Sequence, residues 1–357
     1  MPHATAPEYQ HIQVTELGPT FGAEVSGIDF SKPVEPEVFK EILDAQVKYA
    51  VLVFRNANLD DARHVAFSRL FGELDDVKPY LTLGRKNRFP FDELFDVSNQ
   101  EDDGSIVQVG SKREQTGRYI CVGRSKTFCA TWPELTTHFD SCQGNSLFHC
   151  DSAFNPRRAG YSLLRAHELP PPGHGGNTDF ADTRTAFDEL PDDLRRELVE
   201  NDYIGANSLW HSRRKACPES EYLASIDPEA YPFGRHRIVQ RHEASGRTNL
   251  YIAHHLHHLE YPNVDGQPQH RRVEEPHSTE LIERLLAHAT QDKYLLSVEW
   301  RQPGDVVCWD NTAVMHRAGV GSFQGRFKRD MRRTTVHDGS STAWGLNERT
   351  TKRMGLP

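Results

Sequence analysis

A histidine and an aspartate two residues apart, His149 and Asp151, are the side chains best suited to do chemistry in this 357-residue chain. If they lie on a β-strand, both point to the same face, so that one imidazole and one carboxylate meet at one place. A second histidine, His316, could join them from far along the chain. Two histidines and one carboxylate typically hold non-haem Fe(II) and leave coordination positions open for O2 and a co-substrate. The pattern therefore predicts an iron site made of His149, Asp151 and His316.

Two arginines follow the third candidate ligand at short range. On a strand, Arg329 and Arg333 would share one face, while Asp330 and Arg332 would share the other. Each guanidinium on the metal-facing side could grip a carboxylate through paired N–H donors, which lysine cannot do. Taken alone, such a basic run is more often a solvated edge strand. Its place soon after His316 favours carboxylate binding.

Hydrophobic periodicity predicts the elements that must position these residues. Apolar side chains recur at helical intervals over 37–50, after Asp60, within 182–201 with a break at Pro191, and over 278–291. Apolar runs between Gly, Pro, Asn and Asp clusters predict short strands at 51–54, 94–98, 161–166, 237–240, 250–253, 294–300, 305–309 and 334–337. Many short strands with a few helices favour a mainly β fold with flanking helices, of the double-stranded β-helix (jelly-roll, cupin-like) kind.

The chain carries no internal repeat and no low-complexity linker, so we expect a single domain over residues 1–357. One stretch, at about 104–142, is polar, rich in Gly, Ser and Thr, and without clear periodicity. Long loops in compact domains are usually functional lids or disordered segments. We interpret 104–142 as an atypical insertion or lid.

Composition and charge argue against several classes of protein. The net charge is −9 with acidic and basic residues interspersed, which argues against a nucleic acid or an anionic membrane as partner. No stretch approaches the ~20 apolar residues that span a bilayer. The N-terminus lacks the basic-then-apolar pattern of a signal peptide. We therefore expect a cytoplasmic protein that acts on a small molecule.

The spacing of the six cysteines does not match a metal site. Zinc sites prefer pairs of cysteines separated by two to four residues, and no such pair occurs. A disulfide framework is not expected in a reducing compartment. We therefore expect unpaired thiols at Cys121, Cys129, Cys142, Cys150, Cys217 and Cys308.

The ordered set of motifs resembles one known family, the taurine and 2,4-dichlorophenoxyacetate dioxygenases, which use Fe(II) and 2-oxoglutarate. The resemblance covers most of the chain and lapses between about 104 and 142. The segments that carry it, in family order, are 21–29, 51–55, 71–74, 149–151, 176–178, 309–311 with His316, and 329–333.

The resemblance implies a distorted jelly roll with iron held by the three ligands named above. It implies that Arg329 holds the distal carboxylate of 2-oxoglutarate together with Thr178. It also implies that Arg333 binds an anionic group of the substrate and that Asn145 contacts the substrate. The implied reaction couples oxidative decarboxylation of 2-oxoglutarate, to succinate and CO2, with O2-dependent hydroxylation of a substrate carbon. Family members often form dimers or tetramers, which leaves a homo-oligomer open.

Three alternatives stay open at this point. A branch of the family that oxidises xanthine to urate shares the run 145–149, but it replaces the substrate-facing arginine with glutamine, whereas this chain keeps Arg333. Because a buried guanidinium without an anion is costly, Arg333 favours an acidic substrate. A metal-dependent hydrolase or lyase could use the same three ligands, and a non-catalytic cupin-like binding protein could retain them. The paired arginines argue against both.

Four clustered histidines and one lysine need a separate interpretation. Neighbouring residues on a strand alternate between faces, so the four histidines cannot all converge on one metal, and we expect one of them to line the substrate pocket. They are His254, His255, His257 and His258. Lys78, just after the segment 71–74, is expected to be an exposed surface residue.

Overall fold

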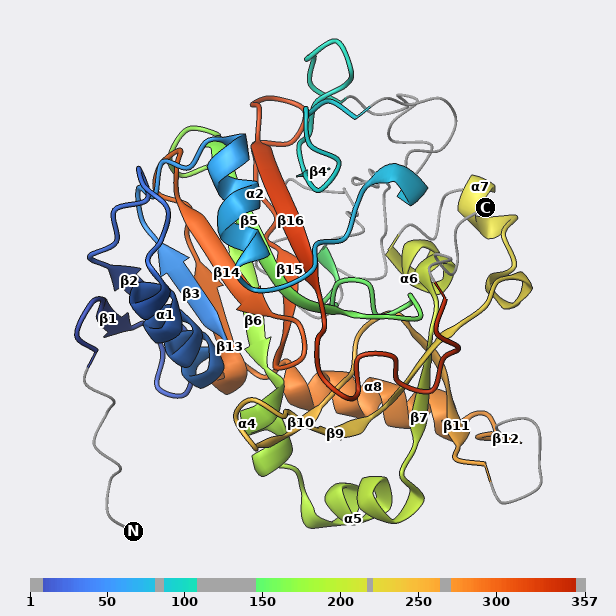
Figure 1. The fold of residues 1–357 in the computed structure, drawn as a ribbon. Coiled ribbons are helices and arrows are strands. Elements are labelled where there is room, and N and C mark those ends of the chain that lie inside the picture. Colours follow the sequence, from blue (N-terminus) through green and yellow to red (C-terminus); the bar gives the residue numbers. More distant parts are fainter. Residues whose placement is uncertain (1–8, 81–86, 108–145, 217–220, 264–270, 351–357) are drawn as a thin grey trace.

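The computed structural model describes residues 9–80, 87–107, 146–216, 221–263 and 271–350, whose strands form four β-sheets (Figure 1). Asn145 lies outside the described residues. So do most of the predicted insertion, of which only 104–107 are described, and four of the cysteines. These are Cys121, Cys129, Cys142 and Cys217.

The largest sheet has seven strands in the order β1-β2-β3-β14-β5-β16-β4. Its strand pairs are antiparallel except β2 with β3, which is parallel. The bounds are β1 Gln13–Glu16, β2 Ala23–Ser26, β3 Val51–Phe54, β14 Val306–Asp310, β5 Ala159–Glu168, β16 Asp330–His337 and β4 Phe95–Asp96.

Three smaller sheets complete the β structure of the described ranges, with the orders β13-β6-β15, β12-β11-β7-β8 and β10-β9. The first of them carries one of the candidate iron ligands, His316, on β15. The bounds are β13 Leu295–Val298, β6 Thr178–Asp182, β15 Val314–Ala318, β12 Arg271–Arg272, β11 Leu256–Tyr261, β7 Ile204–Asn207, β8 Gly234–Arg237, β10 Thr248–Leu250 and β9 Val239–Arg241.

Most of the helices pack against strands of the sheets. The bounds are α1 Pro36–Tyr49, α2 Asp61–Arg69, α4 Thr183–Asp188, α5 Asp192–Asn201, α6 Leu209–Ala216, α7 Glu221–Ala224 and α8 His277–Ala289. Short 3-10 helices in the described part of the chain are η1 Lys78–Tyr80, η5 Pro228–Ala230 and η6 Asp292–Tyr294. None of the helices in the described ranges combines the length and the apolar character needed to cross a membrane.

The seven-stranded sheet carries an apolar core on each face, which explains why its strand β3 is apolar without interruption. On β3, Leu52 and Phe54 join the core formed with α1 and α2. Val51 and Val53 instead join the core shared with β6, β13 and β15 of the three-stranded sheet. Side chains alternate between faces along a strand, so a strand covered on both sides has no polar face to show. Figure 1 shows α1 and α2 on one side of this sheet.

The coarse sequence prediction of a mainly β fold with flanking helices is confirmed. The strand at 51–54 and the helices at 37–50 and 278–291 appear within a few residues of the predicted bounds. The break at Pro191 is also correct, since this residue stands between α4 and α5 as the N-cap of α5.

Other boundaries were wrong. The strand predicted at 237–240 is divided between β8 and β9 at Ile238. The strand predicted at 250–253 ends at Leu250. Strands β6, β7, β11 and β15 were not predicted, because their mixtures of polar and apolar side chains lack a clear period of two.

A histidine is buried where α2 meets the sheet. His64 has no exposed surface, and its Nε2 lies 3.2 Å from the Leu163 carbonyl oxygen and 3.3 Å from Thr334 Oγ1. Burial, reinforced by the positive charge of Arg165, lowers the pKa of His64 to about 3. The folded protein therefore keeps this imidazole neutral at pH values where a solvated histidine is protonated.

We predict that the free energy of unfolding falls as the pH is lowered from about 6.5 towards 3, partly because of His64. In this window the unfolded chain protonates a histidine of ordinary pKa, about 6.5, while the folded chain does not. The unfolded state then binds more protons, so stability rises with pH. Urea denaturation at pH 7 and pH 5 measures how much free energy of unfolding is lost on acidification. This loss should be smaller for His64→Gln than for the native protein.

The matched control is His277→Gln, at the start of α8, where the side chain is 51% exposed. This variant should keep the pH dependence of the native protein. If the free energy of unfolding depended on pH equally in the native protein and in His64→Gln, the prediction would be contradicted.

Candidate metal centre

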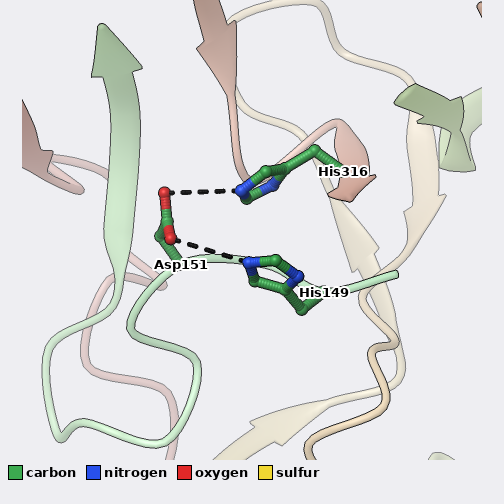
Figure 2. A group of neighbouring side chains, drawn as sticks. All are labelled: His149, Asp151 and His316. Carbon is green, nitrogen blue, oxygen red and sulfur yellow. Dashed lines mark ion pairs between the residues drawn. The ribbon is translucent and has the colours of Figure 1, made fainter. Parts of the chain in front are cut away.

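The three predicted ligands come together in one buried group (Figure 2). His316 Nε2 lies 3.7 Å from Asp151 Oδ2, and His149 Nε2 lies 4.0 Å from Asp151 Oδ1. One ligand atom from each residue falls within 4.8 Å of the others. Among the described residues this is the group of side chains able to hold a metal ion, and no cysteine belongs to it. Cys150 and Cys308 are free and buried.

An isolated antiparallel bridge brings the two histidines side by side. The backbone N–H of His149 donates to the His316 carbonyl at 2.9 Å, and the His316 N–H donates back at 2.9 Å. Asp151 follows in a turn rather than on a strand, and Ser152 after it has a φ of 55°. The strand assumed in the sequence prediction is therefore wrong. The ligands still converge because the bridge fixes one end of this short run and the turn directs the other.

Both imidazoles are neutral, and that of His149 is also held in the tautomer that leaves Nε2 free for a metal. His149 Nδ1 lies 2.8 Å from the Leu147 carbonyl oxygen, so it carries the proton and leaves Nε2 as the free lone pair. The His316 ring packs against Trp309, with centroids 4.6 Å apart, and stacks on Phe180 at 6.3 Å. Burial lowers the pKa of both histidines. They are therefore neutral near pH 7, as metal ligands must be.

The third ligand is ionised although it is buried. Burial opposes the charge of Asp151, but the Arg333 guanidinium beside it holds the pKa of this carboxyl well below its usual range. Arg333 Nη1 donates to Asp151 Oδ1 at 2.5 Å, and Ser162 Oγ donates to Oδ2 at 2.8 Å. Two neutral imidazoles and one carboxylate are the donor set that Fe(II) takes in such sites, so these residues fit a bound ferrous ion.

Arg333 faces the centre because side chains alternate along β16. Its neighbour Arg332 points the other way and forms an ion pair with Asp61 on α2 at 2.7 Å. Arg333 lies over the Phe95 ring, with its guanidinium carbon 5.4 Å from the centroid. Its Nε has no hydrogen-bond partner among the described residues. Arg333 therefore retains donor capacity next to the candidate ligands.

Arg329 is a buried cation without an acidic partner in the described part of the chain. It is 8% exposed, and its Nη2 donates to the Gly176 carbonyl at 3.0 Å. No carboxylate of the described residues lies within ion-pair distance of it, and its Nε has no partner there. Burial alone lowers the pKa of Arg329 to about 10, so it stays charged at pH 7. Such a group is costly unless an anion joins it.

Gly176 lies beside this guanidinium, and Thr178 follows two residues later in the chain. A Cβ on Gly176 would come 3.2 Å from Arg329 Nε and 3.3 Å from the Phe323 ring, and the residue has a φ of 93°, so glycine suits this position. Thr178 begins β6 and shares a face with Phe180, which stacks on His316. Thr178 Oγ1 accepts a hydrogen bond from Trp300 Nε1 at 3.1 Å, which leaves its own hydrogen free to donate.

The remaining predicted residues are placed as follows. Of the four clustered histidines, His255 is the one that packs beside a candidate ligand, with its ring centroid 5.8 Å from that of His149. None of the four belongs to the metal-binding group. Lys78 forms an ion pair with Asp92 at 2.8 Å and is 69% exposed at its side chain, as predicted for a surface residue.

Sequence reasoning missed two buried residues that contact Asp151. Ser162 donates to its carboxylate, and the Asn311 side chain accepts from its backbone N–H at 3.0 Å. A signal existed for each of them. Asn311 stands in the segment 309–311 that carries the family resemblance, and Ser162 is a polar residue next to the apolar pair Leu163 and Leu164 of β5.

Comparisons with known proteins agree with this geometry. The family described as "Taurine catabolism dioxygenase TauD, TfdA family" matches residues 13–335. The chain is 31% identical over 324 residues to the α-ketoglutarate-dependent 2,4-dichlorophenoxyacetate dioxygenase of Burkholderia sp. (strain RASC), covering 90% of this chain and 92% of that protein. It is 32% identical over 326 residues to the enzyme of the same name from Cupriavidus pinatubonensis (strain JMP 134 / LMG 1197), covering 90% and 96%.

A solved structure is similar to this chain in its fold. The crystal structure of AAD-2 in complex with Mn(II) and N-oxalylglycine matches with a TM-score of 0.73 at 29% identity. The match covers 93% of this chain and 99% of that one. Mn(II) and N-oxalylglycine there stand in for the metal and the co-substrate.

Fold and site together define a mononuclear metalloenzyme with a two-histidine, one-carboxylate centre. The chain belongs to the TauD, TfdA family. It is therefore a dioxygenase, an oxidoreductase that requires Fe(II), 2-oxoglutarate (α-ketoglutarate) and O2. The hydrolase, lyase and non-catalytic alternatives are set aside on this ground.

We predict that Arg329→Met raises the free energy of unfolding of the metal-free, co-substrate-free protein by about 1–2 kcal/mol. The substitution removes a buried charge that no carboxylate of the described residues compensates, and it fills similar volume. Urea denaturation measures the change.

The matched control is Arg158→Met, because Arg158 is also buried, at 2% exposure, but donates to Asp338 at 2.8 Å. Removing it leaves Asp338 without this cation and should destabilise the protein by about 3 kcal/mol or more. Equal destabilisation by the two substitutions would contradict the prediction for Arg329.

Proposed function

We propose that the protein hydroxylates a small organic substrate that carries a carboxylate, sulfonate or similar anionic group. The observation that carries this proposal is the guanidinium of Arg333, which adjoins the candidate ligands and retains free donor capacity. Both relatives described above act, by name, on 2,4-dichlorophenoxyacetate, which is a carboxylate. An aryloxyalkanoate is therefore a suitable first substrate to test.

In this proposal His149, Asp151 and His316 hold the iron. Arg329 binds the distal carboxylate of 2-oxoglutarate, and the Thr178 hydroxyl donates a second hydrogen bond to it. The buried and uncompensated charge of Arg329 supports this role, because a carboxylate would replace the solvation that burial has removed. Asn145 stays a predicted substrate contact, since it lies outside the described residues.

In this proposal, some residues of the chain bind and orient the substrate, and others exclude water from the centre. Bound iron supplies the O2 chemistry that couples decarboxylation of 2-oxoglutarate to hydroxylation of the substrate. Arg333 orients the substrate by its anionic group, so that one carbon faces the metal. Trp309 and Phe180 cover the His316 ring and keep water from that side of the centre.

We further propose that the fold is a double-stranded β-helix in a single domain. The seven-stranded and three-stranded sheets share one buried core, which contains Trp309, Phe180 and Met331. The ligands come from both sides of this arrangement, since Asp151 precedes β5 and His316 lies on β15. A cytoplasmic location, a homo-oligomer and a lid at about 104–142 stay predictions from the sequence.

Turnover assays test the proposed function directly. We expect succinate release with iron, O2 and 2-oxoglutarate when a phenoxyacetate, a sulfonate or another organic acid is added, and much less with xanthine, which lacks such a group. The anaerobic protein with Fe(II) and 2-oxoglutarate should show a metal-to-ligand charge-transfer band. Turnover of xanthine in preference to every acid would overturn the proposed substrate class.

For an acidic substrate found in this way, we predict that Arg333→Gln raises the KM at least tenfold, about 1.4 kcal/mol. Glutamine removes the charge-assisted hydrogen bonds but keeps a polar side chain. The KM for 2-oxoglutarate should change little, because Arg329 binds that molecule. Assays are run at saturating Fe(II), since Arg333 also contacts Asp151.

The control is Arg332→Gln, one residue earlier on the opposite face of β16, where the side chain contacts Asp61 instead of the centre. It should leave the substrate KM within about twofold of the native value. An unchanged substrate KM in Arg333→Gln would refute the anion-binding role.

A further inference from the structure

Asn311 is a buried amide whose side chain uses all of its hydrogen-bonding capacity beside the centre. It is 1% exposed and follows β14 directly. Its Oδ1 accepts from the Asp151 backbone N–H at 3.0 Å and from Trp309 Nε1 at 3.1 Å. Its Nδ2 donates to the Gly160 carbonyl at 3.1 Å and to Ser162 Oγ at 3.0 Å. An asparagine side chain can make four hydrogen bonds, and this one makes four.

The chemistry of these partners fixes which way the amide points. A backbone N–H and an indole N–H can only donate, so the atom that they share must be the oxygen of Asn311. The nitrogen then faces Ser162 and donates to it. Ser162 Oγ in turn lies 2.8 Å from Asp151 Oδ2, which as a carboxylate oxygen can only accept. Donation therefore runs in one direction, from Asn311 through Ser162 to Asp151.

The two residues hold Asp151 at two different points. Asn311 holds its backbone, and Ser162 holds the carboxylate oxygen that lies nearer to His316 Nε2. Ser162 is placed for this because it is the register partner of Trp309 across the β5–β14 pair. Both contacts are buried, with Ser162 at 0% and Asp151 at 5% exposure. Water therefore does not compete for them.

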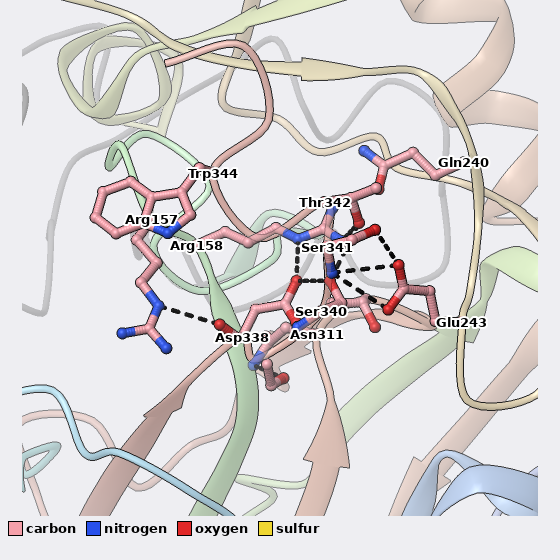
Figure 3. A network of polar contacts seen from close by, with 12 residues as sticks. Arg157, Arg158, Gln240, Glu243, Asn311, Asp338, Ser340, Ser341, Thr342 and Trp344 are labelled. Carbon is pink, nitrogen blue, oxygen red and sulfur yellow. Dashed lines mark hydrogen bonds and ion pairs between the residues drawn. The ribbon is translucent and has the colours of Figure 1, made fainter. Parts of the chain in front are cut away.

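Asp151 needs such support because no strand ladder holds it. It lies in a turn, and the chain from there to β5 is irregular. The far end of this irregular stretch is tied down separately, where Arg158 donates to Asp338 at 2.8 Å and to Thr342 Oγ1 at 3.0 Å (Figure 3). The near end is held at Asp151 by Asn311 and Ser162, in addition to the Arg333 contact described above. Side chains thus do for this stretch what backbone pairing does for His149 and His316.

We propose that Asn311 and Ser162 are positioning residues that orient the Asp151 carboxylate for the metal, with Asn311 acting both directly and through Ser162. The inference rests on the proposed role of His149, Asp151 and His316 as iron ligands. Neither residue touches the reacting atoms. Their effect is on how tightly the metal is held and on the symmetry of its surroundings.

Metal affinity without co-substrate tests this inference. Mn(II) binding is followed by electron paramagnetic resonance in the native protein and in Ser162→Ala. We expect about tenfold weaker binding in Ser162→Ala, the lower end of what loss of a contact behind a metal ligand usually costs. The stabilisation by Mn(II) against heat, relative to the same variant in chelator, should shrink in parallel. This second measurement separates loss of metal affinity from general loss of stability.

Ser68→Ala is the matched control. The Ser68 hydroxyl is also 0% exposed and lies 2.8 Å from the His64 carbonyl oxygen and 2.6 Å from Thr334 Oγ1, but on the α2 side of the sheet. It should lower stability in chelator and leave Mn(II) affinity within twofold. Native-like affinity in Ser162→Ala, or an equal loss in Ser68→Ala, would overturn the inference. If the native protein itself bound no Mn(II), the proposed metal site would fail instead.

A second variant, Asn311→Asp, tests the direction of the hydrogen bonds. The new carboxylate would offer Ser162 a competing acceptor and draw its hydrogen away from Asp151. Mn(II) affinity should fall at least as far as in Ser162→Ala. Adding Ser162→Ala to Asn311→Asp should then cost less than threefold more, because both changes break the same contact. Losses that multiply would show two independent effects and would contradict the proposed path through Ser162.

Discussion

One antiparallel bridge between His149 and His316 is the constraint on which the rest of the centre depends. Two reciprocal backbone hydrogen bonds of 2.9 Å set these histidines opposite each other, although they come from distant parts of the chain. Side chains opposite each other in such a pair lie close together on one face. The position of two of three ligands is thus decided by backbone pairing, which is insensitive to most substitutions, and only Asp151 depends on side-chain contacts.

Buried charge is managed differently on the two sides of the centre. Asp151 and Arg333 compensate each other directly, and the metal adds positive charge to a carboxylate that already has a partner. Arg329 has no such partner among the described residues and remains charged. The folded protein therefore contains one buried charge that no described carboxylate compensates, and a dicarboxylic co-substrate bound there would compensate it.

The sequence was informative where a local pattern determines the outcome. The apolar strand at 51–54, the break at Pro191 and the amphipathic helices follow from periodicity and from the geometry of proline. The three ligands could be predicted because only a few combinations of side chains hold iron. The bridge between His149 and His316 could not be predicted, since neither segment contains a pattern that identifies the other as its pairing partner.

The contacts of Asn311 and Ser162 were beyond sequence reasoning for a related reason. A polar residue in a predicted buried strand indicates that a hydrogen-bond partner is needed, but the sequence does not identify that partner. The partner here is set by the register of β5 against β14, a property of the whole sheet. Strands β6 and β15 escaped prediction similarly, because burial of polar residues such as Thr178 and His316 at a site disturbs the alternation that marks a strand.

Alternation along β16 links the orientation of Arg333, the proposed substrate contact, to contacts on the opposite face of the sheet. Sliding this strand by one residue would turn Arg332 inward and Arg333 towards α2. The contacts of Arg332 with Asp61 and of Thr334 with Ser68 resist that slip from the far side of the sheet. Helix α2 therefore helps to fix the register of β16. The face on which Arg333 lies is therefore fixed partly by side chains on the other face of the sheet.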